Sequence, residues 1–410
     1  MPTAKLETTC CIAGGGPAGM MLGMLLARAG VDVVVLEKHA DFLRDFRGDT
    51  IHPSTLEIMY ELGLLDEFLT LPHQKARTLH GQVGDAEVTI ADFSHLPTQA
   101  KFIAIMPQWD FLNFLAAKAA RYRSFALRMR SAATGLIEEN GKVVGVTAAS
   151  PEGPVEIRAD LVIGADGRHS TIREAAGLAV ESLGAPMDVL WFRLSRLPGD
   201  SEETGGRFDA GRIFVMLNRG EHWQCAYVIA KGSLEAIRAK GLPAFRQSVA
   251  ALAPFAGDRV GEIASWDDVK LLTVAVDRLK TWHRPGLLCI GDAAHAMSPI
   301  GGVGVNLAVQ DAVAAANILA APLREKRLTS AGLARVQRRR MLATRIIQGM
   351  QVTVQNRIIS PLLGRAEKLK TPLVVRLFQR FPVLRRIPAR LVGLGIRPEH
   401  VGTPEAQSAK

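Results

Sequence analysis

The sequence predicts an α/β fold, α+β overall: a Rossmann-like nucleotide-binding domain with an inserted, mostly antiparallel β-sheet domain and a basic helical C-terminus. Three observations support this prediction. A strand, a glycine turn, a helix and a second strand follow one another in the first 40 residues, residues 188–276 alternate like strands, and the basic residues are concentrated near the C-terminus. With 410 residues, 48% of them hydrophobic, the chain is long enough to bury the core of two or three domains.

The first 36 residues form one βαβ unit. Residues 8–13 are predicted to form a short buried strand that ends at Gly14. The apolar pattern from Pro17 to Arg28 is helical, and Gly30 ends it. The run Val33–Leu36 contains three valines, which is typical of an inner parallel strand. About 30 residues of this kind are the length of a βαβ unit.

A glycine motif lies between the first strand and the first helix, Gly14-Gly15-Gly16-Pro17-Ala18-Gly19. It fits G-x-G-x-x-G, in which the first glycine allows the tight turn, the second lets backbone amides approach a pyrophosphate, and the third lets helix and strand pack closely. The phosphate would lie at the positive helix N-terminus. Glu37 ends the second strand, where a carboxylate can bind a ribose hydroxyl. The motif therefore predicts a dinucleotide site.

The remaining elements are less sharply marked. Apolar patterns predict helices over 54–69, 110–120, 305–320 and 333–358. Strands are predicted over 142–148, 155–157, 161–164, 188–194, 212–217, 222–229, 269–276 and 286–290.

Two further motifs identify the dinucleotide. One is Asp160-Leu-Val-Ile-Gly-Ala-Asp166-Gly167-Arg168, a buried strand followed by a polar turn; the other is Gly291-Asp292-Ala-Ala-His295, which leads to Pro299, Gly301, Gly302, Gly304 and Asn306. In this combination the sequence resembles the single-component (class A) FAD-dependent monooxygenases of the p-hydroxybenzoate hydroxylase family and the ubiquinone-biosynthesis hydroxylases. The resemblance extends from residue 8 to about residue 320.

The resemblance implies three units. These are a discontinuous FAD-binding domain (1–75, 101–180 and 281–330), a substrate-binding sheet domain (76–100 and 181–280) and a C-terminal helical basic segment (331–410). It also implies a set of cofactor-binding residues: Gly14, Gly16, Pro17, Ala18, Gly19, Glu37, Arg47, Gln108, Asp166, Gly167, Asp292, Pro299, Gly301, Gly302, Val303, Gly304 and Asn306. Local alternatives remain for three positions: Arg47 as a surface ion-pair residue, Asp166 as an ordinary turn residue, and His295 as a residue that only satisfies its turn.

The loop from Pro299 to Asn306 would line the isoalloxazine ring. Backbone amides at the start of the following helix would stabilise the negative charge of a reduced flavin. Glycines let the backbone pass close to the ring. Pro299 has no N–H to compete and stiffens the wall, so it is the first candidate for a catalytic position. The second candidate is Tyr227, one of only three tyrosines in the chain, although strand tyrosines often only pack.

The resemblance implies a reaction as well. NAD(P)H docks transiently and reduces FAD, O₂ forms a flavin C4a-hydroperoxide, and oxygen passes to an aromatic or lipophilic small molecule by hydroxylation or epoxidation. The sequence does not select between NADH and NADPH, and it shows no second G-x-G-x-x-G after a strand. An FAD-dependent reductase of prenyl double bonds, like the geranylgeranyl reductases, is the alternative enzyme; a flavin-binding protein without turnover is a third interpretation.

Charge and cysteine content exclude several classes. Residues 321–410 contain 19 Lys and Arg but four acidic residues, whereas the whole chain is net +10; the basic excess is therefore local, and no nucleic-acid-binding motif is present. The four cysteines lack metal-ligand spacing, so we expect neither a metal site nor disulfides. No signal peptide or membrane span is expected. We expect a cytoplasmic protein whose basic C-terminal helices either contact a membrane surface or pack on the body; the oligomeric state is not indicated.

Overall fold

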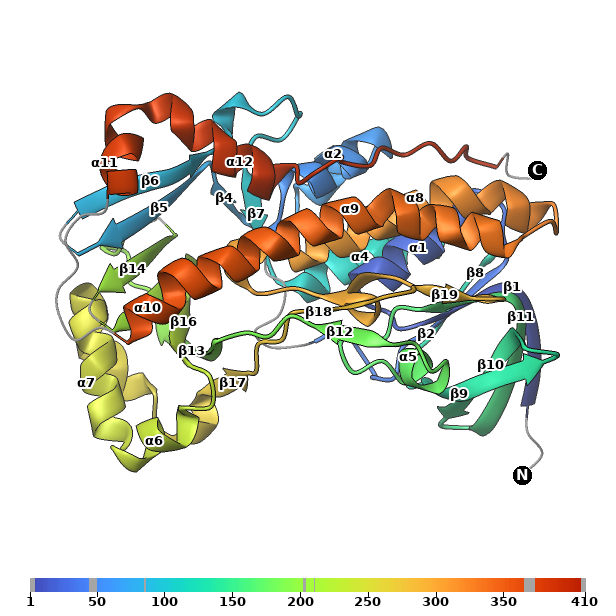
Figure 1. Cartoon of the computed structure of the whole chain (residues 1–410), viewed down its shortest axis with the longest axis horizontal. Coiled ribbons are helices and arrows are strands. Elements are labelled where there is room, and N and C mark those ends of the chain that lie inside the picture. Colours follow the sequence, from blue (N-terminus) through green and yellow to red (C-terminus); the bar gives the residue numbers. More distant parts are fainter. Residues whose placement is uncertain are drawn as a thin grey trace.

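The computed structural model describes residues 4–43, 50–84, 86–201, 204–209, 211–364 and 373–406. Two large sheets lie side by side in an elongated molecule, and one long helical layer crosses both of them (Figure 1). The N-terminal and C-terminal ends of the chain lie at the same end of the molecule (Figure 1).

The first sheet is the parallel framework that the sequence predicts. Its order is β19 (His283–Arg284), β20 (Leu287–Cys289), β11 (Gly153–Gly164), β1 (Ala4–Ala13), β2 (Val33–Leu36) and β8 (Phe125–Arg128), and β10 (Lys142–Ser150) and β9 (Ala132–Glu139) extend from β11. The strands from β20 to β8 are parallel. Ile12 of β1 lies between Ile163 and Val35 of its neighbours, and all three side chains are fully buried. Such burial on both faces explains the continuous apolar runs of these strands.

Helices cover one face of this sheet. They are α1 (Pro17–Arg28), α4 (Gln108–Ala119) and α8 (Gly304–Arg324), with α9 (Ser330–Val354) packed on α8. Pro17 is in the first turn of α1, where its missing N–H costs nothing. The other face packs against β9, β10 and the short α5 (Thr171–Ala175). Helix α8 and the turn before it, Ile300–Arg324, are long and apolar enough to cross a membrane, but 78% of the most apolar window is buried in the protein. Its hydrophobicity is therefore that of a core helix.

The second sheet is mostly antiparallel. Its order is β17 (Lys270–Leu272), β13 (Met187–Ser195), β16 (His222–Ala230), β15 (Arg212–Asn218), β14 (Gly205–Asp209), β5 (Thr78–Val83) and β6 (Ala86–Asp92). Only the pairing of β14 with β5 is parallel. Two small sheets connect the units: β3 (Thr50–Ile51), β7 (Ile103–Ile105) and β4 (Gln74–Ala76), and β12 (Val180–Ser182), β18 (Asp277–Leu279) and β21 (His295–Ala296).

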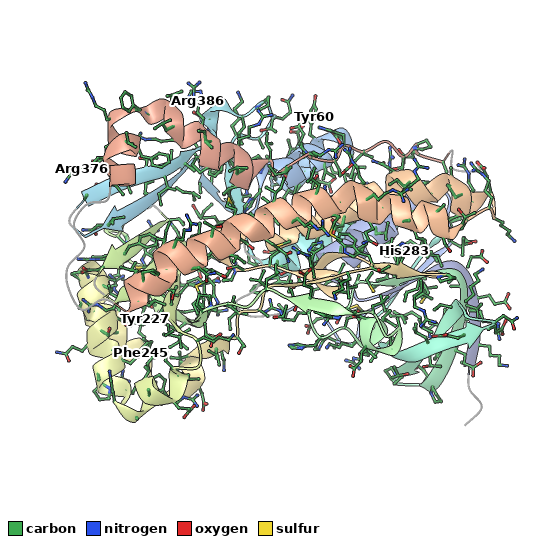
Figure 2. All side chains as sticks on the ribbon, viewed as in Figure 1. Tyr60, Tyr227, Phe245, His283, Arg376 and Arg386 are labelled. Atoms are coloured by element: carbon green, nitrogen blue, oxygen red, sulfur yellow. The ribbon has the colours of Figure 1, made fainter. Side chains whose placement is uncertain are left out.

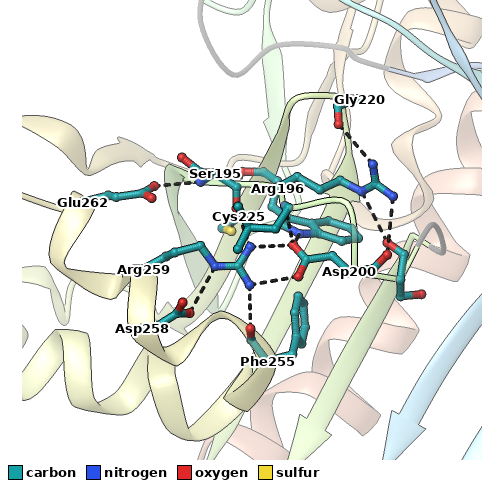
Figure 3. A network of polar contacts seen from close by, with 12 residues as sticks. Ser195, Arg196, Asp200, Gly220, Cys225, Phe255, Asp258, Arg259 and Glu262 are labelled. Carbon is teal, nitrogen blue, oxygen red and sulfur yellow. Dashed lines mark hydrogen bonds and ion pairs between the residues drawn. The ribbon is translucent and has the colours of Figure 1, made fainter.

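The segment between β16 and β17 is helical, which the strand-like texture does not predict. It contains α6 (Leu234–Ala239), α7 (Leu242–Leu252) and the 3-10 segments η2 (Pro254–Glu262) and η3 (Trp266–Asp268). A buried ion pair fixes η2 to the loop after β13: Arg259 and Asp200 are each about 7% exposed, and Arg259 Nη2 donates to Asp200 Oδ1 at 2.9 Å (Figure 3). Trp223 Nε1 donates to the same carboxylate at 3.0 Å.

Five predicted elements differ from the observed ones. The predicted helix over 54–69 is broken at Gly63, whose φ is +68°, into α2 (Pro53–Glu61) and α3 (Leu65–Phe68). The strands predicted at 155–157 and 161–164 are one strand, β11, because both lie in one register with β1. The strand predicted over 269–276 contains only the three residues of β17. The helix predicted over 333–358 is α9, which changes at Gln355 into a π-helical turn, η6 (Gln355–Ile359).

The C-terminal segment first turns away and then returns to the body. After α10 (Ser360–Leu363), the elements α11 (Leu373–Arg380), η7 (Pro382–Arg385) and α12 (Arg386–Gly393) pack beside β6. Residues 394–406 then run back over the helical layer (Figure 1). Gly402 N donates to Asn317 Oδ1 at 2.8 Å and Ala406 N to the carbonyl of Arg28 at 2.8 Å. This last stretch therefore packs on the body.

Candidate functional site

The glycine turn lies at the carboxyl end of β1. Gly14 has φ +107°, and a Cβ there would lie 2.3 Å from the carbonyl oxygen of Ala165. A Cβ at Gly19 would lie 1.9 Å from the carbonyl oxygen of Gly14. By contrast, a Cβ at Gly16 would meet no atom within 4 Å. Gly14 and Gly19 are thus required by the fold, whereas Gly16 leaves open space at the N-terminus of α1, where an anionic ligand is favoured.

Glu37 lies at the end of β2, directly against this turn. The amide of Gly15 donates to its Oε2 at 3.1 Å, and the amide of His39 donates to its Oε1 at 3.0 Å. The carboxylate is buried and held at the turn. Each carboxylate oxygen can accept more than one hydrogen bond, so a ribose hydroxyl can still bind there.

The Asp-Gly motif after β11 has a clear local function. Asp166 Oδ2 accepts from the amide of Ile172 at 3.1 Å, and its Oδ1 accepts from the hydroxyl of Ser170. Asp166 therefore fixes the start of α5, in agreement with its interpretation as a turn residue. Gly167 has φ +89° with open space around its Cβ position, so the requirement for glycine there is conformational.

The Gly-Asp turn after β20 meets the glycine turn. A Cβ at Gly291, whose φ is +58°, would lie 3.0 Å from Cβ of Ala18 and 3.3 Å from Cβ of Ala308. Asp292 is half-exposed beside this contact, 3.9 Å from Arg168 Nη2. The ends of β1, β11 and β20 therefore bring all three motifs to one edge of the parallel sheet, which is where such sheets bind their ligands.

The loop from Pro299 to Gly302 has an unusual backbone. Gly301 has φ +78° and Gly302 has φ +63°, and the amide of Gly302 donates to the carbonyl of Pro299 at 3.0 Å. A Cβ at Gly302 would lie 2.5 Å from the hydroxyl oxygen of Thr50, which donates to the Gly302 carbonyl at 3.1 Å. Two glycines are therefore required here by conformation and by the close approach of β3.

Three residues of the predicted cofactor loop offer no side chain to a cofactor. Two of these side chains pack inside the protein, and the third residue is a glycine. The Asn306 amide is buried: its Oδ1 accepts from His52 N at 2.9 Å and from Thr55 Oγ1 at 2.7 Å. Val303 packs in a buried cluster with Met297, Leu307 and Ile347. Gly304 begins α8. Only the backbone of these residues is available to a ring in front of the loop.

The remaining two predicted cofactor contacts are Gln108 and Arg47. Gln108 is the first residue of α4 and is half-buried. It follows β7, which pairs with β3 and so belongs to the end of the molecule that carries Gly302. Arg47 lies outside the described residues.

Tyr227 lies on the face of β16 that packs against α7. Its ring packs against Phe214 and Phe245, with centroids 6.3 Å and 5.5 Å away, and its hydroxyl is 2.9 Å from that of Ser248 on α7 (Figure 2). This face of the second sheet is covered by α7 and η2. Strand alternation makes two faces but does not show which one is covered, so the sequence left this choice open.

The opposite face of the second sheet meets the Pro299–Gly302 loop. Ala226 and Val228 share one apolar cluster with Ile300 of the loop and with Ile359 and Leu362 from the end of the helical layer. Further along, this face becomes polar, with Gln224 and then His222 on β16. Burial lowers the pKa of His222, and the nearby charges of Arg193 and Arg219 lower it further. The lowered pKa favours the neutral form of the imidazole.

Sequence reasoning missed two groups around this site. Asp311 of α8 and Arg340 of α9 form a buried ion pair behind the Gly-Asp turn. Gln348, Gln351 and Gln355 project from α9 and η6 toward residues 296–300. The glutamine spacing of three and four residues marks one helix face and could have been noticed. Their partners could not, because they lie about 50 residues away in the sequence.

Comparisons with known proteins agree with this geometry. The FAD binding domain family matches residues 7–350. A 6-methylpretetramide 4-monooxygenase of Streptomyces rimosus is 30% identical over 400 residues, 95% of this chain and 93% of that protein. A rifampicin monooxygenase of Streptomyces venezuelae is 29% identical over 73% of this chain, and the match spans 61% of that longer protein. The chain therefore binds FAD.

A solved structure supports the fold. A probable FAD-dependent monooxygenase from Pseudomonas aeruginosa superposes with a TM-score of 0.73 at 20% identity, covering 88% of this chain and 97% of that one. The residues at the sheet edge fit FAD: an open Gly16 at a helix N-terminus can take the pyrophosphate, Glu37 a ribose, and the two left-handed glycines of the 299–302 loop can pass beside a flat ring.

Proposed function

Because the chain belongs to the FAD binding domain family and is an FAD-dependent monooxygenase, we propose that it hydroxylates a polycyclic aromatic small molecule between the second sheet and the Pro299–Gly302 loop. NAD(P)H and O₂ are the co-substrates, as is typical of such monooxygenases. One relative, the monooxygenase of Streptomyces rimosus, acts by its name on 6-methylpretetramide. A large, lipophilic aromatic substrate of that kind suits an apolar wall.

One observation carries the proposed location. Ile300, inside the loop that would face the flavin ring, shares a buried cluster with Ala226 and Val228 on the face of β16 opposite α7. A molecule held against that face therefore lies next to the loop. We also propose the three-unit division, with residues 76–100 and 181–280 as the substrate unit.

We assign the predicted cofactor residues to the parts of FAD that they contact and to the turns that hold it. Gly14, Gly16, Gly19 and Glu37 hold the ADP half of the cofactor, and Asp292 holds the ribitol. The backbone from Pro299 to Asn306 lines the ring, and Gln108 and Arg47 complete the contacts. Pro17, Ala18, Asp166, Gly167, Gly301, Gly302, Val303 and Gly304 shape the turns. Tyr227 is not part of the proposed site.

The bound flavin supplies the redox chemistry, from NAD(P)H to O₂. The chain has three tasks. The amides at the start of α8 stabilise negative charge at the ring. The apolar face of the second sheet excludes water from the reacting atoms. Gln224 and the neutral His222 can hold a hydroxyl of the substrate and orient its ring.

The experiment is substrate-dependent turnover with isotope tracing. FAD-loaded protein, NADPH and ¹⁸O₂ are combined with a tetracyclic phenol or, as the control for size, a monocyclic phenol. We expect faster NADPH oxidation and ¹⁸O in the product with the tetracyclic compound. Reduction of a prenyl double bond without oxygen uptake would instead establish the reductase alternative. Turnover of the monocyclic phenol alone would contradict the proposed substrate class.

We further propose that this otherwise cytoplasmic enzyme contacts an anionic membrane surface through the outer side of α11, η7 and α12. Four apolar side chains there are 39–60% exposed: Leu377, Phe381, Val383 and Ile387. Five arginines accompany them, and residues 373–393 contain no acid; Arg376 and Arg386 point outward at the edge of the molecule (Figure 2). Exposed apolar groups among cations match an anionic bilayer interface.

Co-sedimentation with vesicles tests this contact. The full chain should bind vesicles that contain phosphatidylglycerol and not purely phosphatidylcholine vesicles. The double variant Phe381→Asp and Ile387→Asp should lose binding, whereas Leu197→Asp, at an apolar residue 46% exposed elsewhere, should not. Absence of binding by the full chain, or unchanged binding by the double variant, would refute the contact.

A further inference from the structure

A row of three glutamines joins the long helical layer to the segment that precedes the Pro299–Gly302 loop. Gln348 and Gln351 lie on α9, and Gln355 begins the π-helical turn η6. Their spacing of three and four residues places them on one face. All three side chains are completely buried. Burying three uncharged amides is costly unless they are hydrogen-bonded, so their partners explain their presence.

Gln351 makes the central contacts. Its Oε1 accepts from the amide of Ser298 at 3.1 Å, and its Nε2 donates to the carbonyls of Ser298 at 3.0 Å and Ile300 at 2.9 Å. One side chain thus binds three backbone groups on both sides of Pro299. The backbone groups of Ser298 and Ile300 bind the Gln351 amide in place of the neighbouring strand that would satisfy them in a sheet.

The other two glutamines extend the contact in both directions. Gln348 Nε2 donates to the carbonyls of Ala296 at 3.1 Å and Asp277 at 2.7 Å. Gln355 Nε2 donates to the hydroxyl of Ser298 at 2.7 Å. The helix changes to π-helical geometry at this last glutamine, and isolated π-helical turns are frequent at functional sites.

We infer that the glutamine row is a positioning element that sets where the Pro299–Gly302 loop stands, and through it the flavin ring. The inference rests on the proposed placement of the ring at this loop. Gln351 and Gln355 lie beyond the residues that the FAD binding domain family matches, which end at 350. The row binds the backbone of Ser298 and Ile300, so we assign its residues to positioning the ring and not to contact with the reacting atoms.

The same helix provides a matched control. Gln337 also makes two bonds to backbone: its Oε1 accepts from Trp282 N at 3.0 Å, and its Nε2 donates to the Lys280 carbonyl at 3.0 Å. These partners lie outside the predicted flavin loop. Gln337→Met therefore removes a similar clamp from the same helix without touching the loop.

The test combines hydrogen exchange with the visible spectrum of bound FAD. In Gln351→Met, the amides of residues 296–298 and 300–302 should exchange about tenfold faster or more than in the wild type, because three hydrogen bonds are lost. The spectrum of bound FAD should also shift. Gln355→Met, which loses one bond, should show the same changes to a smaller extent. Gln337→Met should speed exchange at 280–283 only and leave the spectrum unchanged.

Two results would overturn the inference. One is unchanged exchange at 296–302 in both Gln351→Met and Gln355→Met. The other is faster exchange with an unaltered FAD spectrum. It would show that the glutamine row holds the loop, but that the loop does not determine the position of the flavin ring. Neither result contradicts the proposed function, because FAD still binds in both cases. A wild-type chain that binds no FAD would refute the proposed function.

Discussion

The guanidinium of Arg340 donates from Nε to Oδ1 of Asp311 across 2.9 Å, and both side chains are at most 2% exposed. The other carboxylate oxygen, Oδ2, is 2.6 Å from His295 Nε2 and accepts from the amide of Gly291 at 3.1 Å. Gly291 begins the turn that carries Asp292. The ion pair between α8 and α9 is therefore connected to a turn at the proposed cofactor site.

Removing the carboxylate charge should destabilise the protein and weaken FAD binding together. In Asp311→Asn the buried Arg340 loses one of its two carboxylate partners and keeps Glu399, whose Oε1 lies 3.3 Å from Nη1. We expect this loss to cost about 3–5 kcal/mol of unfolding free energy. Urea unfolding measures the first effect and FAD fluorescence titration the second. Arg339→Ala, at a residue whose side chain is 38% exposed, is the control and should cost less than about 1 kcal/mol. Unchanged FAD affinity in Asp311→Asn would show that the ion pair does not support FAD binding through the turn at Gly291 and Asp292.

The lowered pKa of Asp311 implies that its contribution to stability is lost at acidic pH. Burial raises the pKa of Asp311, but the charges and hydrogen bonds of His295 and Arg340 outweigh it, so its pKa lies below the ordinary value. A carboxyl with a lowered folded pKa contributes stability above its unfolded pKa of about 3.9 and loses it as the pH falls through the folded pKa. The stability difference between wild type and Asp311→Asn should therefore shrink below pH 4 in a pH series of urea unfolding. A constant difference would contradict this assignment.

Gly16 gives a test of the cofactor site that leaves the fold intact. A Cβ at Gly16 meets no protein atom within 4 Å, so we expect Gly16→Val to fold normally. It would project into the space proposed for the pyrophosphate and should weaken FAD binding by about 100-fold or more. Gly199→Val, at another position with open space, is the control and should bind FAD normally. Full FAD occupancy in purified Gly16→Val would refute the placement.

The buried pair between Asp200 and Arg259 should matter for stability alone (Figure 3). Asp200→Asn should cost about 3–5 kcal/mol of unfolding free energy, since it leaves a buried guanidinium without its main counterion. Asp258→Asn is a matched control, because Asp258 contacts the same guanidinium at 3.2 Å but is 70% exposed; it should cost less than about 1 kcal/mol. FAD affinity should be unchanged in both variants, in contrast to Asp311→Asn.

The parts of the molecule that the sequence predicts are those encoded by local spacing. The βαβ unit and its glycines follow from neighbouring residues, and Pro17–Arg28 and Val33–Leu36 have the predicted bounds. The helices of 234–262 and the partners of Gln351 depend on tertiary packing, which no local pattern encodes. Strand β16 shows the limit clearly: alternation defines two faces, but only the position of α7 shows which one is covered.

The two faces of β16 yield the last prediction. Tyr227→Phe removes one hydrogen bond, to Ser248 on the covered face, and should cost about 1 kcal/mol of stability while kcat/KM stays within about twofold of wild type. Gln224→Leu, on the face that meets the Pro299–Gly302 loop, should lower kcat/KM about tenfold, mostly by raising KM, because it removes the hydrogen bond to substrate that we propose for Gln224. Steady-state kinetics with the tetracyclic phenol measures both. A larger loss in Tyr227→Phe than in Gln224→Leu would show that the substrate lies on the other side of the sheet.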